Sequence, residues 1–166
     1  MNAPTWLATS ILPFLTAACT SYSPNVHLVG LSKEEVLGRM GQPEQKIPKA
    51  EGGTLWVYPR GPQGHHTYFL SFDIARRLLA YKQVLSRENF LLISPGMTQP
   101  EVERRIGPSK VRESLARQRG ELHSYRYEGP FCDWFQVEYN AEKVVRSTGF
   151  GVPLECRGGT WDLSTQ

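Results

Sequence analysis

The sequence lacks the local motifs that carry the chemistry of several common enzyme classes. Its 166 residues contain no G-x-S-x-G, no H-E-x-x-H, no phosphate loop and no C-x-x-C. The sequence therefore has no recognisable motif for serine hydrolysis, zinc proteolysis, phosphate-loop chemistry or dithiol exchange. The sequence predicts a protein that is not an enzyme, with no catalytic residues, no metal site and no cofactor.

Strong charge of either sign is also missing. The chain has 19 Lys and Arg against 16 Asp and Glu, for a formal net charge of +3. Such a modest excess gives no argument for nucleic acid as a partner. Hydrophobic residues make up 40% and charged residues 21%, which is typical of a globular protein rather than a disordered one.

Cysteine is scarce, with three residues in the chain. If Cys19 has a separate role, Cys132 and Cys156 remain as an even pair. In an oxidising compartment we expect them to form a disulfide. The bond would close a loop of about 25 residues and stabilise the fold by roughly 3 kcal/mol. The alternative is two unpaired thiols in a reducing cell.

No apolar run is long enough to cross a membrane. The longest uncharged, mostly apolar stretch is TWLATSILPFLTAA, Thr5 to Ala18, which fits a signal peptide over residues 1–18. The small residues just before Cys19 resemble a bacterial lipobox, in which that cysteine is lipidated. Neither Thr20 nor Ser21 is the Asp that retains lipoproteins at the inner membrane of enteric bacteria. We therefore expect a lipid-anchored protein on the periplasmic face of the outer membrane.

Two features of the leader argue against this interpretation. No Lys or Arg precedes Cys19, and Thr16 occupies a position where Leu is commoner in lipoboxes. An ordinary secretory peptide, or a wrongly assigned start codon on a cytosolic protein, would also account for the stretch. These alternatives stay open at the level of sequence.

A helix signal occurs twice, 66 residues apart. Residues 30–36 align without a gap with residues 96–102, and both helices end at a glycine, Gly41 and Gly107. Each copy begins with a capping box, in which a Ser or Thr is followed three residues later by Glu. The boxes are Ser32 with Glu35 and Thr98 with Glu101. The repetition of cap and stop predicts two copies of one unit.

Strand patterns follow each helix signal. Three alternating segments are expected at residues 54–58, 66–72 and 77–84, and three more at 123–127, 134–139 and 143–150. The fold class predicted is α+β: two tandem units, each one or two helices followed by a three-stranded antiparallel meander, with the helices on one face of the sheet. The expected divisions are a tether over 19–25, repeats over 26–85 and 86–150, and a tail over 151–166. Because each unit is small, we expect the two to pack together, with a shared sheet as one arrangement.

Six residues are candidates for a binding surface. Arg104, Arg105, Lys110 and Arg112 cluster after the second helix and could meet anionic lipid head groups, although a solvated polar loop would look the same. Phe69 and Trp134 are expected on the opposite faces of their strands from the core aromatics. They predict either an exposed recognition surface or a contact between the units.

Other polar residues give little evidence of a metal site or a catalytic site. His65 and His66 are adjacent in a strand and point to opposite faces, so they do not easily share a metal. Glu101 and Glu103 are two apart on a helix and do not face each other. Cys132 beside Asp133 has no histidine near it in the sequence, and a disulfide explains it better than a nucleophile.

The second unit resembles the BamE family, also called SmpA/OmlA, of small outer-membrane lipoproteins. The resemblance lies in Asn89-Phe90-x-x-Ile93, Gly96-Met97-Thr98-x-x-x-Val102, Ile106-Gly107-Pro108, Tyr125-x-Tyr127 and Val137-x-Tyr139-Asn140. The resemblance implies no enzymatic activity, an accessory role in β-barrel assembly at the outer membrane, and contact with phosphatidylglycerol. The tandem arrangement is also similar to secreted β-lactamase inhibitor proteins.

The function expected from the sequence is therefore that of a non-catalytic outer-membrane lipoprotein that binds envelope proteins, with the β-barrel assembly complex as the implied partner. Anionic lipid is a second expected contact. The alternative is a secreted or periplasmic inhibitor that lays its sheet on an enzyme.

Overall fold

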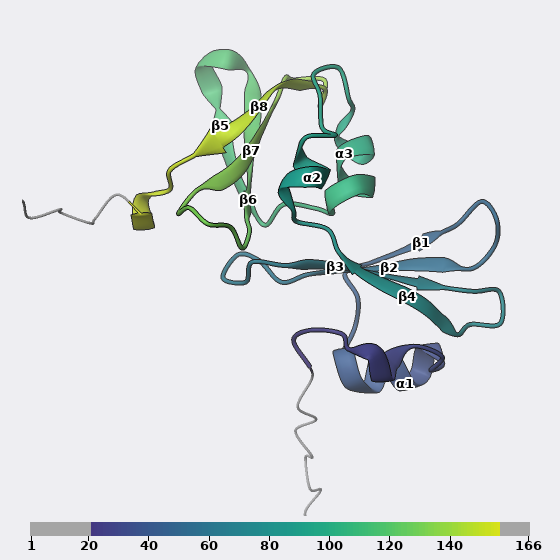
Figure 1. Cartoon of the computed structure of the whole chain (residues 1–166). Coiled ribbons are helices and arrows are strands. Elements are labelled where there is room, and N and C mark those ends of the chain that lie inside the picture. Colours follow the sequence, from purple (N-terminus) through teal and green to yellow (C-terminus); the bar gives the residue numbers. More distant parts are fainter. Residues whose placement is uncertain (1–20, 157–166) are drawn as a thin grey trace, which may run out of the picture.

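A computed structural model of the chain describes residues 21–156. The expected signal peptide over residues 1–18, the expected lipidation site Cys19 and most of the expected tail lie outside the described residues. Figure 1 shows two units, the second above the first, each with a sheet and its own helices.

The first unit has one α-helix and four strands. Its elements are η1 (Val26–Leu28), α1 (Lys33–Met40), β1 (Gln45–Pro48), β2 (Thr54–Pro59), β3 (Thr67–Phe72) and β4 (Leu78–Gln83). The strands pair antiparallel in the order β1-β2-β3-β4.

The second unit has two α-helices before its sheet. Its elements are α2 (Arg87–Phe90), α3 (Gln99–Ile106), β5 (Val111–Leu115), η2 (Ala116–Gln118), β6 (Gly120–Arg126), β7 (Trp134–Tyr139), β8 (Val145–Gly151) and η3 (Leu154–Cys156). The strands again pair antiparallel in sequence order, β5-β6-β7-β8.

The prediction of α+β with antiparallel sheets is confirmed, but three strands per sheet is wrong, because each sheet has four. The strands missed are β1 and β5, which lie at sheet edges. Edge strands can be polar and contain proline, because one side of the backbone needs no partner. β1 ends at Pro48 and exposes every second residue, and β5 carries Arg112 and Glu113. The two units also do not share a sheet.

The same backbone contacts occur in both units. Gly30 N–H donates to the carbonyl of Leu78 at 2.8 Å, and Gly96 N–H donates to the carbonyl of Val145 at 2.9 Å. Residues Ser32 and Arg77 form an isolated bridge in the first unit, as Thr98 and Val144 do in the second. These contacts tie the start of each helix to the last strand of its own sheet.

The helix boundaries follow from the caps. Ser32 N–H donates to the Glu35 carboxylate at 2.8 Å, and Thr98 N–H donates to the Glu101 carboxylate at 2.7 Å. Both helices stop at a glycine with positive φ, 75° at Gly41 and 78° at Gly107. Positive φ is unfavourable for residues with a Cβ, which explains the repeated glycine.

Each sheet buries an aromatic face against its own helices. In the first unit Val36 and Met40 of α1 pack with the residues Trp56, Tyr58, Leu70, Phe72 and Leu78. In the second, Val102 and Ile106 of α3 and Phe90 of α2 pack with the residues Tyr125, Tyr127, Phe135, Val137, Tyr139 and Val145. Burial of these side chains is the main stabilising contribution in each unit.

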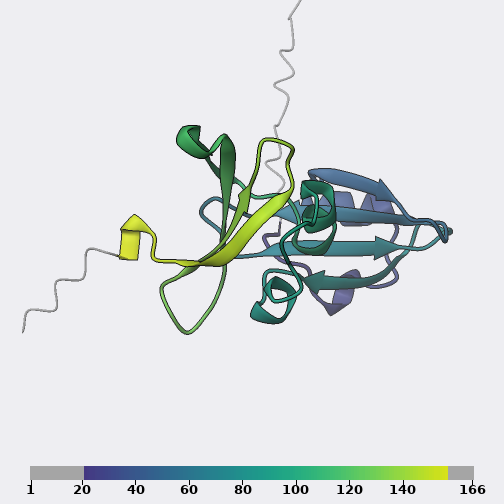
Figure 2. The ribbon, with the colours of Figure 1, turned by 90° about the horizontal axis from the view of Figure 1, so that it is seen from above.

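The first sheet is covered on both faces. Figure 1 shows it between α1 on one side and the helices of the second unit on the other. Val57 and Thr67 point away from α1, yet they are only 0% and 2% exposed. The end of α3 contributes to this cover, because a Cβ built on Gly107 would lie 2.6 Å from Cγ2 of Thr67 and 3.6 Å from Cγ1 of Val57. Figure 2 shows the two sheets side by side from above.

Candidate binding surface

The connection between β6 and β7, residues 127–133, forms a loop that we call the disulfide loop. Its first residue, Tyr127, is 6% exposed, and its ring meets the Phe90 ring edge-on at 5.1 Å between centroids. The Tyr127 hydroxyl donates to the Asp133 carboxylate at 2.8 Å and accepts from Arg87 at 3.0 Å. Burial and the bond to Asp133 raise the pKa of Tyr127. The two ends of the loop are thus joined by a polar contact above the core.

The other end of the disulfide loop is held covalently. Cys132 is disulfide-bonded to Cys156, with 5.9 Å between their Cα atoms. Beside the bond, Arg126 forms an ion pair with Glu155 at 3.2 Å. The disulfide and the ion pair therefore hold the loop and the segment after β8 together.

The first unit also contacts the disulfide loop. Arg126 donates to the carbonyl of Gln63 at 3.0 Å, and His66 Nε2 lies 3.1 Å from the Glu128 carboxylate. Gln63 and His66 belong to the connection between β2 and β3. This connection reaches the loop across the junction of the two units, so both units fix its base.

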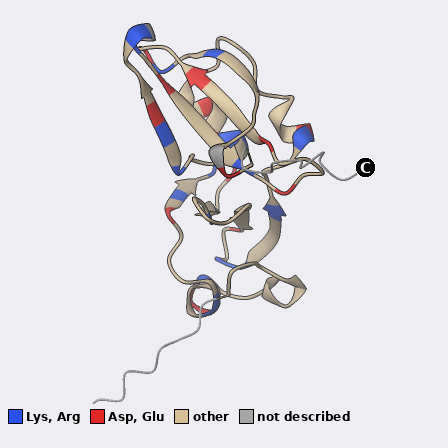
Figure 3. Cartoon of the chain, turned by 90° about the vertical axis from the view of Figure 1, so that its left-hand side faces the viewer, with Lys and Arg blue, Asp and Glu red and all other residues tan. Residues whose placement is uncertain are grey.

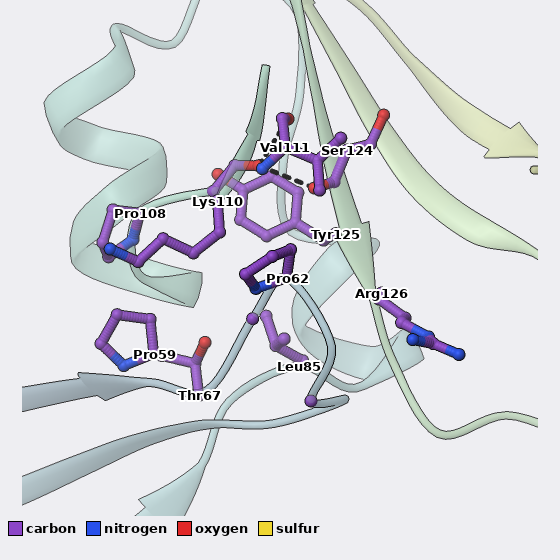
Figure 4. Close-up of a pocket in the computed structure, with 13 residues that line it drawn as sticks. Pro59, Pro62, Thr67, Leu85, Pro108, Lys110, Val111, Ser124, Tyr125 and Arg126 are labelled. Atoms are coloured by element: carbon purple, nitrogen blue, oxygen red, sulfur yellow. Dashed lines mark hydrogen bonds between the residues drawn. The ribbon is translucent and has the colours of Figure 1, made fainter.

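A small cavity lies at that junction. Its walls include the residues Pro59, Pro62, Leu85, Pro108, Lys110 and Tyr125 from both units (Figure 4). Its volume of about 20 Å³ holds about one water molecule, so it is not a ligand site. Ser109 is 3% exposed, and its hydroxyl donates to the carbonyl of Ser124 at 2.7 Å. The junction is therefore well packed.

Two aromatic side chains lie at the surface of this fastened loop. Phe131 is 71% exposed, and Trp134, the first residue of β7, is partly exposed. Both line an open hollow of about 440 Å³, together with the residues His65, Arg126, Asp133 and Glu155. A second hollow of about 340 Å³ is bordered by Arg87 and also borders residues 127–130 of the loop. The loop thus borders two open hollows, and its exposed Phe131 side chain lines the larger one.

Two residues of the expected basic cluster have acidic partners. Lys110 forms an ion pair with Glu44 of the first unit, and Arg112 approaches Glu103 at 3.7 Å. Arg104 and Arg105 are exposed at the end of α3. Figure 3 shows basic and acidic segments interspersed over the second sheet rather than separated by sign.

The two predicted aromatics are also in different places. Phe69 is partly buried at the contact between the units, where a Cβ on Gly107 would lie 3.5 Å from its Cε1. Trp134 lies on the opposite face of β7 from the buried Phe135 and beside the disulfide loop. Of the six candidates, Trp134 is therefore the one that the structure places next to Phe131.

His123 and Glu121 form a partly buried pair in the second unit. His123 has 0% side-chain exposure, and its Nε2 lies 3.1 Å from the Glu121 carboxylate. Burial lowers the pKa of His123, while the hydrogen bond from Lys143 is the largest cause of the lowered pKa of Glu121. Between residues 21 and 156 no three His, Cys, Asp or Glu side chains are grouped so as to hold a metal ion.

Phe131 was missed by sequence reasoning. It lies in the turn between two predicted strands, outside any alternating pattern, so periodicity gives no information about it. The available signal was an aromatic residue between Gly129-Pro130 and Cys132, where turn residues are usually polar.

Comparisons with known proteins do not place the chain in a family. No protein-family model matches the sequence, and no curated protein matches it. The prediction of a BamE (SmpA/OmlA) family member is therefore wrong. Its motifs, a capped helix start and a Gly-Pro stop, specify local backbone geometry, and unrelated proteins can share such geometry.

Two solved structures show a weak overall likeness. One is an extracellular protein containing a SCP domain from Bacillus anthracis str. Ames, with 15% identity and a TM-score of 0.32. The match covers 87% of this chain but only 56% of that protein. The other is a DUF4309 family protein (YjgB) from Bacillus subtilis subsp. subtilis str. 168, with 11% identity, a TM-score of 0.29 and coverage of 83% and 84%. Scores this low establish neither fold nor function.

The disulfide is the structural feature that bears on location. Such bonds form and persist in oxidising compartments and are rare in cytosolic proteins. Within residues 21–156, none of the helices has the length and apolar character needed to cross a bilayer.

Proposed function

We propose that this protein is a non-catalytic binding module of the cell envelope that recognises another protein through the disulfide loop. The observation that carries the proposal is Phe131, which is 71% exposed on a loop held by a disulfide, an ion pair and the first unit. Exposed aromatic residues often dominate the energy of protein–protein contacts. A loop already fixed in place loses little conformational entropy on binding.

The proposal includes export and anchoring at the outer membrane through a lipid on Cys19. The role in β-barrel assembly depended on the family resemblance, so it is not included. An enzyme partner, as for an inhibitor, is the second candidate. A disulfide-held loop with an exposed aromatic side chain suits insertion into an active-site cleft.

Photo-cross-linking tests the contact directly. Benzoylphenylalanine replaces Phe131 in one variant and Leu91 in a matched control, since Leu91 is 79% exposed on the second unit, in the segment after α2. After irradiation of intact cells, we expect a specific covalent adduct from position 131 and none from position 91. Adducts at neither position, or the same adducts at both, would contradict the proposal. Loss of enzymatic activity in the captured protein would identify the inhibitor role.

A further inference from the structure

We propose that the segment over residues 21–29 is the face of the protein that rests on the lipid bilayer. The proposal rests on the lipid anchor included in the proposed function. It is argued from how this segment is fixed, what it exposes and how few residues separate it from Cys19.

The segment is not a free tether. Ser21 N–H donates to the carbonyl of Arg39 at 2.6 Å, and Arg60 donates to the carbonyl of Ser21 at 3.0 Å. The Tyr22 hydroxyl lies 3.0 Å from His66 Nδ1, and the Tyr22 ring meets the Tyr68 ring edge-on. The expected tether over residues 19–25 is thus fastened to the first unit from Ser21 onward.

The fastening limits the distance from the anchor. Two residues of extended chain span at most about 7 Å, so a lipid on Cys19 would lie within that distance of Ser21. An anchor on so short a connection holds the body of the protein against the membrane rather than suspending it at a distance.

The segment exposes apolar side chains where that contact would occur. Val26 is 70% exposed, Val29 is 48% exposed and Tyr22 is 47% exposed. A Tyr at a membrane surface keeps its hydroxyl in the polar layer while its ring enters the apolar one. Burial of these groups in the interface would add to the attachment supplied by the lipid.

The charges around this face are mixed. Arg39 and His27 are exposed there, and so are Glu34, which pairs with Arg76, and Glu35, which caps α1. The occupant inferred is therefore the bilayer surface in general, contacted by apolar groups, and not an anionic lipid bound by a cationic patch. Figure 1 shows the second sheet on the far side of the first sheet from α1, so most of the second unit faces away from this segment, and His66 links Tyr22 to Glu128 where the units meet.

The test compares two exposed aliphatic positions. Val26→Trp places a reporter on the proposed face, and Leu91→Trp places one on the second unit, at similar exposure, 70% and 79%. Each processed protein, beginning at Cys19, carries either its native acyl chains or a maleimide lipid attached to Cys19. It is then bound to vesicles of brominated phosphatidylcholine. We expect the added fluorescence of Val26→Trp to be quenched and that of Leu91→Trp to be unaffected. Val29→Trp serves as a second reporter if Val26→Trp folds poorly.

The failures are distinguishable. Mass analysis of the native protein shows whether Cys19 is acylated, and an unmodified Cys19 would contradict the anchor without touching the orientation measured with the maleimide lipid. An unquenched Val26→Trp, or equal quenching at both positions, would overturn the proposed face. Quenching that requires phosphatidylglycerol in the vesicles would overturn its apolar character.

Discussion

Trp56 and His123 occupy matching positions in the two units. Trp56 pairs with Lys46 across β1 and β2, and His123 pairs with Arg112 across β5 and β6. Both side chains are fully buried or nearly so, and each has a ring nitrogen without a hydrogen-bond partner, Nε1 of Trp56 and Nδ1 of His123. A buried imidazole can take up a proton near neutral pH, whereas a buried indole cannot.

His123 therefore predicts acid-sensitive stability. Burial lowers its pKa below the ordinary value of 6.5, so the unfolded chain binds a proton more readily than the folded one. Stability is then complete above about pH 6.5 and falls as the pH drops toward the folded pKa, by at most about 1.4 kcal/mol per pH unit. We expect urea unfolding between pH 7 and 5 to show this loss.

The variant His123→Phe removes the titrating group and keeps an aromatic ring, as in the first unit. It should flatten the stability profile between pH 7 and 5, whereas His27→Gln, a change at an exposed histidine, should leave it unchanged. Glu121 titrates in a lower range, where its own lowered pKa predicts a further loss below about pH 4.5. If His123→Phe kept the loss between pH 7 and 5, His123 would not be its cause.

At the scale of elements, the disulfide loop depends on the bond that closes it. Cys132 and Cys156 are 24 residues apart, so the chain-entropy model predicts a loss of roughly 3 kcal/mol when both are replaced by serine. Urea unfolding of the double variant and of reduced wild-type protein should give the same decrease. If the double serine variant were as stable as the oxidised protein, the disulfide would not contribute to the free energy of unfolding.

Helices were easier to predict than edge strands because their signals are local. Ser32 with Glu35, and Thr98 with Glu101, lie within one helical turn and specify where each helix begins. β1 and β5 form only by pairing with β2 and β6, and their exposed side chains, such as Lys46 and Glu113, look like those of loops. Their formation depends on a neighbouring strand, which periodicity in the segment itself does not reveal.

The whole molecule depends on contacts between residues far apart in the chain. Phe69 and Gly107 meet at the junction, as do Gln63 and Arg126, and His66 and Glu128. Nothing in the sequence near any of these residues indicates its partner. For this reason the sequence could list Phe69 and Trp134 as candidates but could not assign one to the junction and the other to the candidate binding surface.

Two glycines separate the effect of the junction from the effect of backbone conformation. Gly96 and Gly107 both have positive φ, 90° and 78°, and Gly107 also has an extended ψ of 176°, so alanine should cost on the order of 1–3 kcal/mol in backbone strain at either position. A Cβ on Gly96 meets nothing within 4 Å, whereas one on Gly107 would lie 2.6 Å from Thr67. Gly107→Ala should therefore lose a further 1–3 kcal/mol or so from overpacking.

Chemical denaturation of both variants measures this difference. An equal loss at the two positions would mean that the units do not pack as described. A larger loss for Gly107→Ala, with Gly96→Ala as the control, would support a junction that fixes the base of the disulfide loop.

We propose that Phe131 binds a partner protein. The most direct measurement is the affinity of the purified protein for the partner cross-linked from position 131, compared among wild type, Phe131→Ala and Leu91→Ala. Both replaced side chains are exposed, so neither variant should unfold. We expect Phe131→Ala to bind about 30-fold more weakly, as for a residue that dominates an interface, and Leu91→Ala to bind like wild type. Equal affinity of Phe131→Ala and wild type would contradict this proposal.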